Sequence, residues 1–290
     1  MTKLYEKLAR SCPSEQEVKR GLKKVYSEIT GLPDRKTLLE ILGLIDLTSL
    51  NTTDNKSNIL QLTGKINSFY ARYSNIPTVA GICVFPNFVQ IVREKLTARN
   101  VKVVAVAGGF PTSQTFRSIK IQECKLAIDA GADEIDVVIP VGSFLGNDYP
   151  AVAEEIREIK STTGDRLLKV IIETGLLGSN EQIFRASMIA MDAGADFVKT
   201  STGKTSVSAT PESAFVICRA ISVFFRETGI KVGFKPAGGI VTSQDAQVYY
   251  NIVRNELGTD WLNPSLLRFG ASRLANNVLS DIMGSRADYF

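Results

Sequence analysis

One short pattern occurs twice in this chain, as Asp129-Ala-Gly-Ala-Asp-Glu-Ile-Asp136 and as Asp192-Ala-Gly-Ala-Asp-Phe-Val-Lys199. In each copy a helical pattern ends at glycine, and an apolar run typical of a buried strand follows. The alignment places Asp136 and Lys199 at equivalent strand positions, and side chains alternate between the two faces of a strand. If both strands occupy equivalent places in one barrel, the two charged groups point to the same side. A recurring helix-to-strand loop would explain the shared Ala-Gly-Ala-Asp. It would not explain a charge at the end of each strand that follows.

Short apolar runs alternate with amphipathic stretches on both sides of this pattern. Each run is rich in Val, Ile, Leu or Phe and is bounded by turn residues, as expected of buried parallel strands. The predicted strands cover residues 43–47, 79–84, 101–106, 134–139, 168–173, 196–200, 231–235 and 267–270. A helical pattern follows each of them, so the sequence predicts an α/β fold, a TIM (β/α)8 barrel. A doubly wound open sheet is the alternative.

The two ends of the chain differ from its middle. Residues 1–40 are predicted to form a polar N-terminal helical extension, with a helix start at Ser14-Glu15-Gln16-Glu17. No Pro/Ser-rich linker divides the chain, so residues 41–285 are predicted to form one barrel domain that carries the catalytic site. Residues 286–290 are predicted to be a C-terminal tail. Tyr289 is expected to lie in disorder there, and a mobile tail that reaches the site is the less favoured alternative.

Composition excludes several kinds of chemistry. The chain has no histidine, which removes Ser-His-Asp and Cys-His nucleophiles and HExxH zinc hydrolysis. It also argues against a zinc-dependent aldolase, because imidazole is the usual ligand of such a metal. Acid–base chemistry must therefore use Lys, Asp, Glu, Tyr, Cys or water. The formal net charge of +4, from 34 basic and 30 acidic residues, is too near balance to indicate a nucleic-acid partner.

The sequence also bears on compartment. No stretch is apolar and long enough to cross a bilayer, and the first residues lack an apolar signal core. Cys12, Cys83, Cys124 and Cys218 are far apart and form no CxxC pair. We therefore expect reduced thiols in a cytoplasmic protein without a membrane partner.

Polar or ionisable residues stand at the C-terminal ends of most predicted strands. They are Asp46, Cys83, Asp136, Glu173, Lys199 and Lys235. A charge inside a buried strand is costly unless it is paired, and the C-terminal rim of a barrel is where active sites are built. This repeated placement predicts a functional site.

The chemistry expected of that site is amine attack on a carbonyl. Lys199 is the candidate nucleophile, and a neutral amine is favoured by burial and by a nearby cation such as Lys235. Asp136 is a candidate proton shuttle beside Lys235. The alternative is that one lysine only forms a salt bridge to a carboxylate. Asp46 is expected to bind substrate hydroxyls or to order the lysines, and Glu173 to be a structural ion-pair partner.

The last three loops have the composition of a phosphate site. Thr202-Gly203-Lys204, Gly238-Gly239 and Gly270-Ala271-Ser272 follow the sixth, seventh and eighth predicted strands. Glycines let backbone N–H groups approach an anion, and a barrel commonly binds phosphate with these late loops. Turn glycines with a surface lysine are the alternative. For Cys83 a small buried residue is expected, and a reactive thiol is the alternative.

The chain resembles the deoxyribose-phosphate aldolases, which are metal-independent class I aldolases on a TIM barrel. The matching segments are Ile45-Asp-Leu-Thr-Ser-Leu-Asn51, Gly131-Ala-Asp-Glu-Ile-Asp-Val-Val138, Lys169-Val-Ile-Ile-Glu-Thr-Gly175, Lys199-Thr-Ser-Thr-Gly-Lys204, Gly233-Phe-Lys-Pro-Ala-Gly-Gly239 and Phe269-Gly-Ala-Ser272. By this resemblance Lys199 forms the Schiff base, Lys235 perturbs it, and Asp136 relays protons with Lys235. The phosphate-binding segments would contain Gly203, Lys204, Gly238, Gly239 and Ser272.

The resemblance implies that 2-deoxy-D-ribose 5-phosphate is cleaved reversibly to acetaldehyde and D-glyceraldehyde 3-phosphate without metal or organic cofactor. Another class I sugar-phosphate aldolase, or a transaldolase-like barrel, is the alternative enzyme; a barrel used only for binding is the non-enzymatic one. Arg273 departs from the family, which often has Ser or Thr there, and either contacts phosphate or points to solvent. The long N-terminal extension is a second departure. Barrels of this kind often dimerise, so the sequence leaves a homodimer open.

Overall fold

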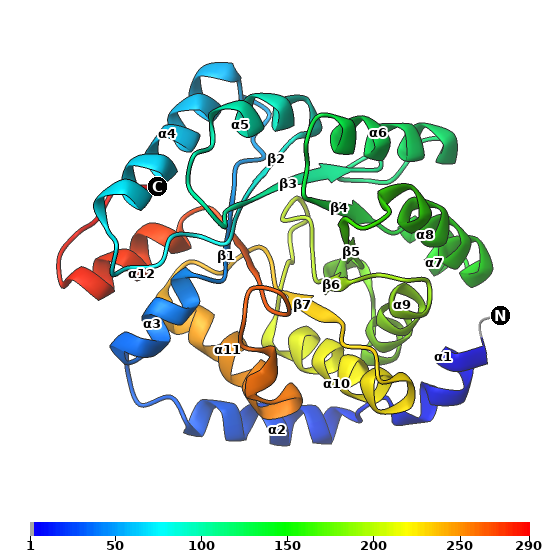
Figure 1. Ribbon diagram of the computed structural model, residues 1–290. Helices are drawn as coiled ribbons and strands as arrows, with labels where there is room; N and C mark the ends of the chain where they lie inside the picture. Colours follow the sequence, from blue (N-terminus) through cyan, green and yellow to red (C-terminus); the bar gives the residue numbers. More distant parts are fainter. Residues whose placement is uncertain (1–2) are drawn as a thin grey trace.

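The chain folds into a closed barrel of parallel strands inside a ring of helices (Figure 1). The computed structural model describes residues 3–290, apart from the side chains of Lys3 and Tyr5. Within that range the strands pair in the order β7-β6-β5-β4-β3-β2-β1-β8. They are β1 Ile45–Thr48, β2 Gly81–Val84, β3 Lys102–Ala107, β4 Glu134–Val138, β5 Leu167–Ile171, β6 Phe197–Lys199, β7 Gly233–Lys235 and β8 Phe269–Ala271.

Closure of the barrel is made between β7 and the chain around β8. Parallel bridges join Phe234 to Leu267 and Ala237 to Gly270. The predicted (β/α)8 barrel is therefore confirmed, and the open doubly wound sheet is wrong. The strands are mostly shorter than predicted. β5, for instance, ends at Ile171, and Glu173 lies beyond it with a left-handed backbone, φ 53°.

Helices cover the outside of the barrel, and several of them begin at a side-chain cap. Capping boxes at Asn55, Thr210 and Thr242 start the helices that begin at Lys56, Pro211 and Ser243, and they satisfy N–H groups that the first turn leaves free. The barrel helices are α4 Lys56–Arg72, α5 Val89–Lys95, α6 Arg117–Asp129, α7 Val141–Leu145, α8 Tyr149–Thr163, α9 Asn180–Asp192, α10 Pro211–Thr228, α11 Ser243–Leu257 and α12 Leu274–Met283. The short α7 was not predicted. Their apolar faces pack on the outer faces of the strands and form the main core.

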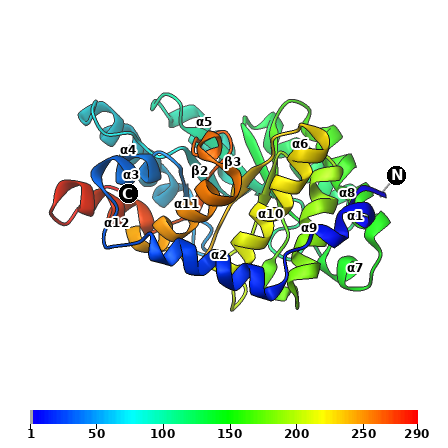
Figure 2. The same cartoon turned by 90° about the horizontal axis from the view of Figure 1, so that it is seen from below.

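The N-terminal extension is helical and lies along the barrel wall (Figure 2). It contains α1 Lys3–Leu8, α2 Glu15–Ser27 and α3 Arg35–Leu42. Ser14 and Glu17 form the capping box that starts α2 where predicted. α2 packs against α10 and α11, and it comes so close to α10 that a Cβ at Gly21 would meet the Phe215 ring at 2.2 Å.

The boundaries of the predicted units differ in detail from the structure. The boundary between residues 40 and 41 falls inside α3, so the extension continues into the barrel without a linker. At the other end, the expectation of disorder for Tyr289 is wrong. Its hydroxyl lies 3.1 Å from that of Tyr73, and its ring packs edge-on against Phe69 of α4. Burial of this aromatic ring holds the tail against the helix.

Candidate active site

A cluster of ionisable side chains fills the inside of the barrel. Its members are Asp46, Glu134, Asp136, Lys169, Lys199, Lys235 and Arg268, each at most 3% exposed. Strand pairing explains why they meet. The register places Lys199 beside Lys235 and Asp136 beside Lys169, and neighbours in register on parallel strands point to the same face.

Asp136 is the centre of the cluster. Its Oδ2 lies 2.8 Å from both Lys199 Nζ and Lys235 Nζ, and its Oδ1 lies 2.9 Å from Lys169 Nζ. The structure thus brings together the three residues proposed from sequence as nucleophile, perturbing cation and proton shuttle. It adds Lys169, which contacts the same carboxylate.

A second layer lies below and holds the first in place. Lys169 Nζ is 2.6 Å from Glu134, and Glu134 in turn accepts a hydrogen bond of 2.8 Å from Arg268. Arg268 is also 2.5 Å from Asp46 Oδ1, and the other oxygen of Asp46 is 2.5 Å from Lys235. Each carboxylate therefore joins two or more cations, which is the condition for burying such charges.

Asp46 orders the cluster from within the barrel. It is fully buried, and its partners are Lys235 and Arg268. It is not among the residues that line the cavity described below. Of the two roles expected for Asp46, the structure therefore supports ordering a lysine over direct contact with substrate hydroxyls.

Glu134, Lys169 and Arg268 were not among the predicted site residues. The predicted residues are those at the C-terminal strand ends, whereas these three lie one layer deeper. The signal was present: Glu134 stands two residues before Asp136, so both face inward, and Lys169 interrupts the apolar run Leu167-Leu-Lys-Val-Ile171. A charge within a buried strand requires a partner, which predicts such a layer.

The charges of the cluster do not balance when every member is ionised. Among the described residues, Lys169, Lys199, Lys235 and Arg268 supply four positive charges against three carboxylates. Burial alone would raise the pKa of Asp136, but the ammonium groups of Lys169, Lys199 and Lys235 outweigh it and hold that pKa well below its usual range. Burial alone would lower the pKa of Lys235, but Asp136 and Asp46 outweigh it and raise that pKa. Asp136 and Lys235 are thus held in their charged forms.

One amine of the cluster opens to a cavity. The cavity has a volume of about 320 Å³ at the C-terminal ends of the strands, and Lys199 lines it, whereas Lys169, Lys235 and Asp136 are not among its lining residues in the described chain. Loss of one proton would bring the net charge of the cluster to zero. Lys199 is the member placed to meet a ligand, so the geometry sets an amine that can attack a carbonyl beside groups that hold protons.

The predicted phosphate loops converge on the same cavity. Its lining includes Thr202, Gly203, Lys204, Gly238, Gly239, Ser272 and Arg273. Gly203 and Gly238 have φ of 77° and 84°, a conformation that favours glycine, and a Cβ at Gly238 would meet Ser208 at 2.5 Å. Helix α12 starts directly after Arg273, with no side chain capping its first turn. Free N–H groups at a helix N-terminus attract an anion, so this end of the cavity suits phosphate.

Glu173 and Cys83 have structural surroundings. The ion pair expected for Glu173 is wrong: its carboxylate accepts hydrogen bonds from the backbone and hydroxyl of Thr202, at 3.2 and 2.6 Å, and so shapes the loop that carries Lys204. Cys83 is fully buried beside Val104 and Val106, and burial raises the pKa of its thiol. The small buried residue expected at Cys83 is confirmed. Within residues 3–290 no group of three or more His, Cys, Asp or Glu side chains is arranged to hold a metal ion.

The barrel, the buried cluster of amines and the cavity at the C-terminal strand ends together have the arrangement of an enzyme active site on a (β/α)8 scaffold. The chain belongs to the DeoC/LacD family of aldolases, whose model matches residues 41–254.

Individual relatives agree with this assignment. The chain is 43% identical to the human deoxyribose-phosphate aldolase over 251 residues, which is 83% of this chain and 79% of that protein. It is 38% identical over 274 residues to a putative deoxyribose-phosphate aldolase of Caenorhabditis elegans, covering 92% of this chain and 88% of that one. A crystal structure of a putative deoxyribose-phosphate aldolase from Toxoplasma gondii superposes with a TM-score of 0.75 at 23% identity, over 86% of this chain and 94% of that one. This last likeness concerns the fold.

Proposed function

We propose that the chain is a deoxyribose-phosphate aldolase that cleaves 2-deoxy-D-ribose 5-phosphate to acetaldehyde and D-glyceraldehyde 3-phosphate through a Schiff base on Lys199. The observation that carries the proposal is that Lys199 alone of the clustered lysines, among the residues described, lines the cavity that the glycine loops surround. The name of the human relative supports the substrate.

Schiff-base formation uses the upper layer of the cluster. The Lys199 amine adds to the C1 aldehyde of the open-chain sugar, and the resulting carbinolamine must gain and lose protons before water leaves. Asp136 Oδ2 lies 2.8 Å from Lys199 and from Lys235, so it can pass protons between the two nitrogens and the substrate. Lys235 returns the proton and keeps the carboxylate paired throughout.

Carbon–carbon cleavage then uses the imine as electron sink. A proton leaves the C3 hydroxyl, the C2–C3 bond breaks, and its electron pair moves into the protonated imine to give an enamine. D-Glyceraldehyde 3-phosphate departs with C3 to C5. Protonation of the enamine at C2 and addition of water to the imine release acetaldehyde and restore Lys199. No step needs a metal or an organic cofactor.

The phosphate is held at the far side of the cavity from the carbonyl. Gly203, Gly238 and Gly239 bring backbone close to it, and Lys204 and Ser272 supply side-chain donors. The Lys204 ammonium donates to the Leu50 carbonyl, so it must exchange that partner for a phosphate oxygen when substrate binds. Such a charge-assisted bond fixes the sugar with C1 toward Lys199.

Other sugar-phosphate aldolases of the Schiff-base type are the competing assignment, and the substrate decides between them. The test compares 2-deoxy-D-ribose 5-phosphate with ketose phosphates, and acetaldehyde with dihydroxyacetone phosphate as donor, after exhaustive chelation. Cleavage of the deoxy sugar and use of acetaldehyde are expected, with full activity in chelator. Preference for a ketose phosphate, or lost activity that zinc restores, would contradict the proposal.

The expected surroundings of the enzyme complete the proposal. Within the described chain no helix is apolar and long enough to span a membrane. Cys12, Cys83, Cys124 and Cys218 are unpaired thiols, which supports a reducing cytoplasm as the compartment. A homodimer remains a prediction to be measured by sedimentation.

A further inference from the structure

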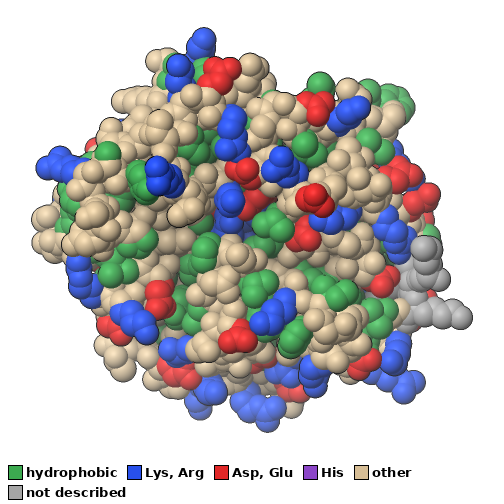
Figure 3. Space-filling model, in the orientation of Figure 1, with side chains coloured by type: hydrophobic (Ala, Val, Ile, Leu, Met, Phe, Trp, Pro, Cys, Tyr) green, Lys and Arg blue, Asp and Glu red, His purple; other side chains and the backbone are tan. Residues whose placement is uncertain are grey.

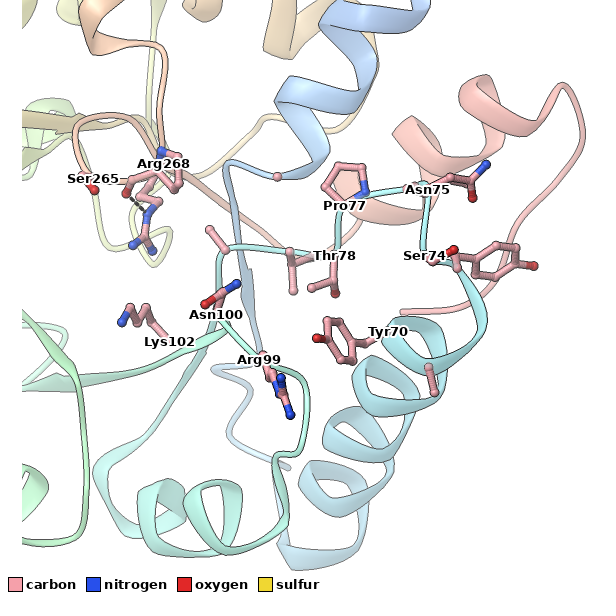
Figure 4. A pocket seen from close by; sticks show the side chains of 17 residues that line it. Tyr70, Ser74, Asn75, Pro77, Thr78, Arg99, Asn100, Lys102, Ser265 and Arg268 are labelled. Atoms are coloured by element: carbon pink, nitrogen blue, oxygen red, sulfur yellow. Dashed lines mark hydrogen bonds between the residues drawn. The ribbon is translucent and has the colours of Figure 1, made fainter.

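A second cavity lies at the opposite end of the barrel, where the strands begin. It has a volume of about 950 Å³, and none of its lining residues lines the lysine cavity. Its walls come from the end of α4, the segment before β2, the start of β3 and the segment before β8 (Figure 4). We propose that this cavity binds a phosphate monoester with a flat apolar part, the chemistry of a nucleoside monophosphate.

The charge of the lining is positive. Arg99, Lys102 and Arg268 line the cavity, and no Asp or Glu is among its described lining residues. The space-filling view shows this end of the barrel, with Lys and Arg side chains near its centre and Asp and Glu side chains beside them (Figure 3). The acidic side chains seen there lie outside the cavity wall.

Two of the three cations are free to take a ligand. Arg268 is already engaged by Asp46 and Glu134. The side chains of Arg99 and Lys102, by contrast, make no hydrogen bond or ion pair with the residues described, and both residues are exposed. The Arg99 guanidinium can bind a phosphate through two N–H groups, and Lys102 adds a second positive charge to the wall.

Cations at this end of a barrel have an ordinary explanation, because the surrounding helices end here and their last carbonyls attract positive charge. Other cations on this face are already engaged by nearby groups. Arg93 donates to the Gly131 carbonyl and to Asp133, and Lys160 is 2.6 Å from Asp196. The side chains of Arg99 and Lys102 have no such partner in the described chain, so neither a helix carbonyl nor a carboxylate accounts for them.

The rest of the wall suits a flat apolar group. Tyr70 is 39% exposed at the rim, and Ile76, Pro77 and Pro264 lie in the lining with it. The Thr78 hydroxyl, also in the lining, is buried without a hydrogen-bond partner among the described residues, which leaves a polar contact unfilled. A phosphate on Arg99 and a ring against Tyr70, which lie on the same side of the cavity (Figure 4), would use both parts of the wall.

The experiment is calorimetric titration of the full chain with adenosine 5′-monophosphate, adenosine and inorganic phosphate as probes. It is done in a Lys204→Gln background, so that the phosphate loops of the lysine cavity do not contribute. The monophosphate is expected to bind, and both adenosine and phosphate to bind at least tenfold more weakly. Adding Arg99→Gln with Lys102→Gln is expected to weaken the monophosphate at least tenfold, whereas Lys125→Gln on α6 leaves it unchanged.

Four results would overturn the proposal. They are no binding of the monophosphate, equal binding of inorganic phosphate, binding that survives the double substitution, and a change of sedimenting mass caused by the double substitution, which would assign the face to a second copy of the chain. The proposal is independent of the aldolase assignment, because the readout is binding in a variant whose lysine cavity is impaired.

Discussion

Replacing Lys235 with methionine should change the pH at which Lys199 reacts. Both nitrogens lie 2.8 Å from the same oxygen of Asp136, so they are separated by no more than twice that distance. At such a separation two unit charges repel by about 3 kcal/mol at an effective dielectric constant of about 20. That energy corresponds to about two pH units. Without Lys235 the cluster has three cations and three carboxylates among the described residues, so its net charge is zero without the loss of a proton. Reaction of Lys199 with an aldehyde should therefore require a higher pH.

The fold should tolerate this change because no carboxylate loses all its partners. Asp46 keeps Arg268, and Asp136 keeps Lys169 and Lys199. The assay is the rate of acetaldehyde labelling in the presence of cyanoborohydride, measured against pH. The pH of half-maximal labelling should rise by about two units from the unsubstituted protein, and Lys125→Met, which removes an exposed lysine, should leave it in place. A midpoint that stays or falls in Lys235→Met would refute the electrostatic reasoning.

Three further outcomes follow from the cluster and the cavity. Arg268→Met should lower the free energy of unfolding, measured in urea, by about 3 kcal/mol. The control Arg254→Met, which breaks an exposed ion pair, should lower it by under about 1 kcal/mol. Equal losses in the two variants would contradict the role of the buried layer. The pKa values of Asp46 and Asp136 are lowered from 3.8, so their stabilisation is complete above that pH and is lost below it. The free energy of unfolding should therefore fall by about 1.4 kcal/mol per pH unit for each carboxyl, and an unchanged acid slope in Asp46→Asn would argue against it. Lys204→Gln should raise KM for 2-deoxyribose 5-phosphate about tenfold and leave unphosphorylated 2-deoxyribose unaffected; an equal effect on both sugars would remove Lys204 from the phosphate site.

The fold was predictable because each strand and helix carries its own local signal. The repeated Asp-Ala-Gly-Ala-Asp segments mark the entry to β4 and β6, and the capping box at Ser14 marks α2. Barrel closure was harder to foresee, since it depends on bridges from β7 to residues 267 and 270, which periodicity along the chain does not encode. The tail was mispredicted because Tyr289 is held by a contact with Tyr73, 216 positions earlier in the chain.

The upper layer of the candidate site could be predicted from the sequence, whereas its lower layer could not. Lys199 and Lys235 end the apolar strands β6 and β7, and Asp136 lies within β4, so their place on the inner face could be predicted from each strand alone. Predicting the lower layer of Glu134, Lys169 and Arg268 requires the strand register across the barrel. The register decides which of these charges form ion pairs with one another. The partner of Glu173 was missed for the same reason: it is a hydroxyl on the next loop, and no spacing rule distinguishes that bond from an ion pair.

The most direct test of the Lys199 assignment is the position of the covalent adduct after acetaldehyde and borohydride are added together and the digest is analysed by mass spectrometry. A reduced two-carbon adduct is predicted on Lys199, the amine that lines the cavity, with labelling abolished in Lys199→Ala. An adduct on Lys169 or Lys235, or labelling as strong in Lys199→Ala as in the unsubstituted protein, would contradict it.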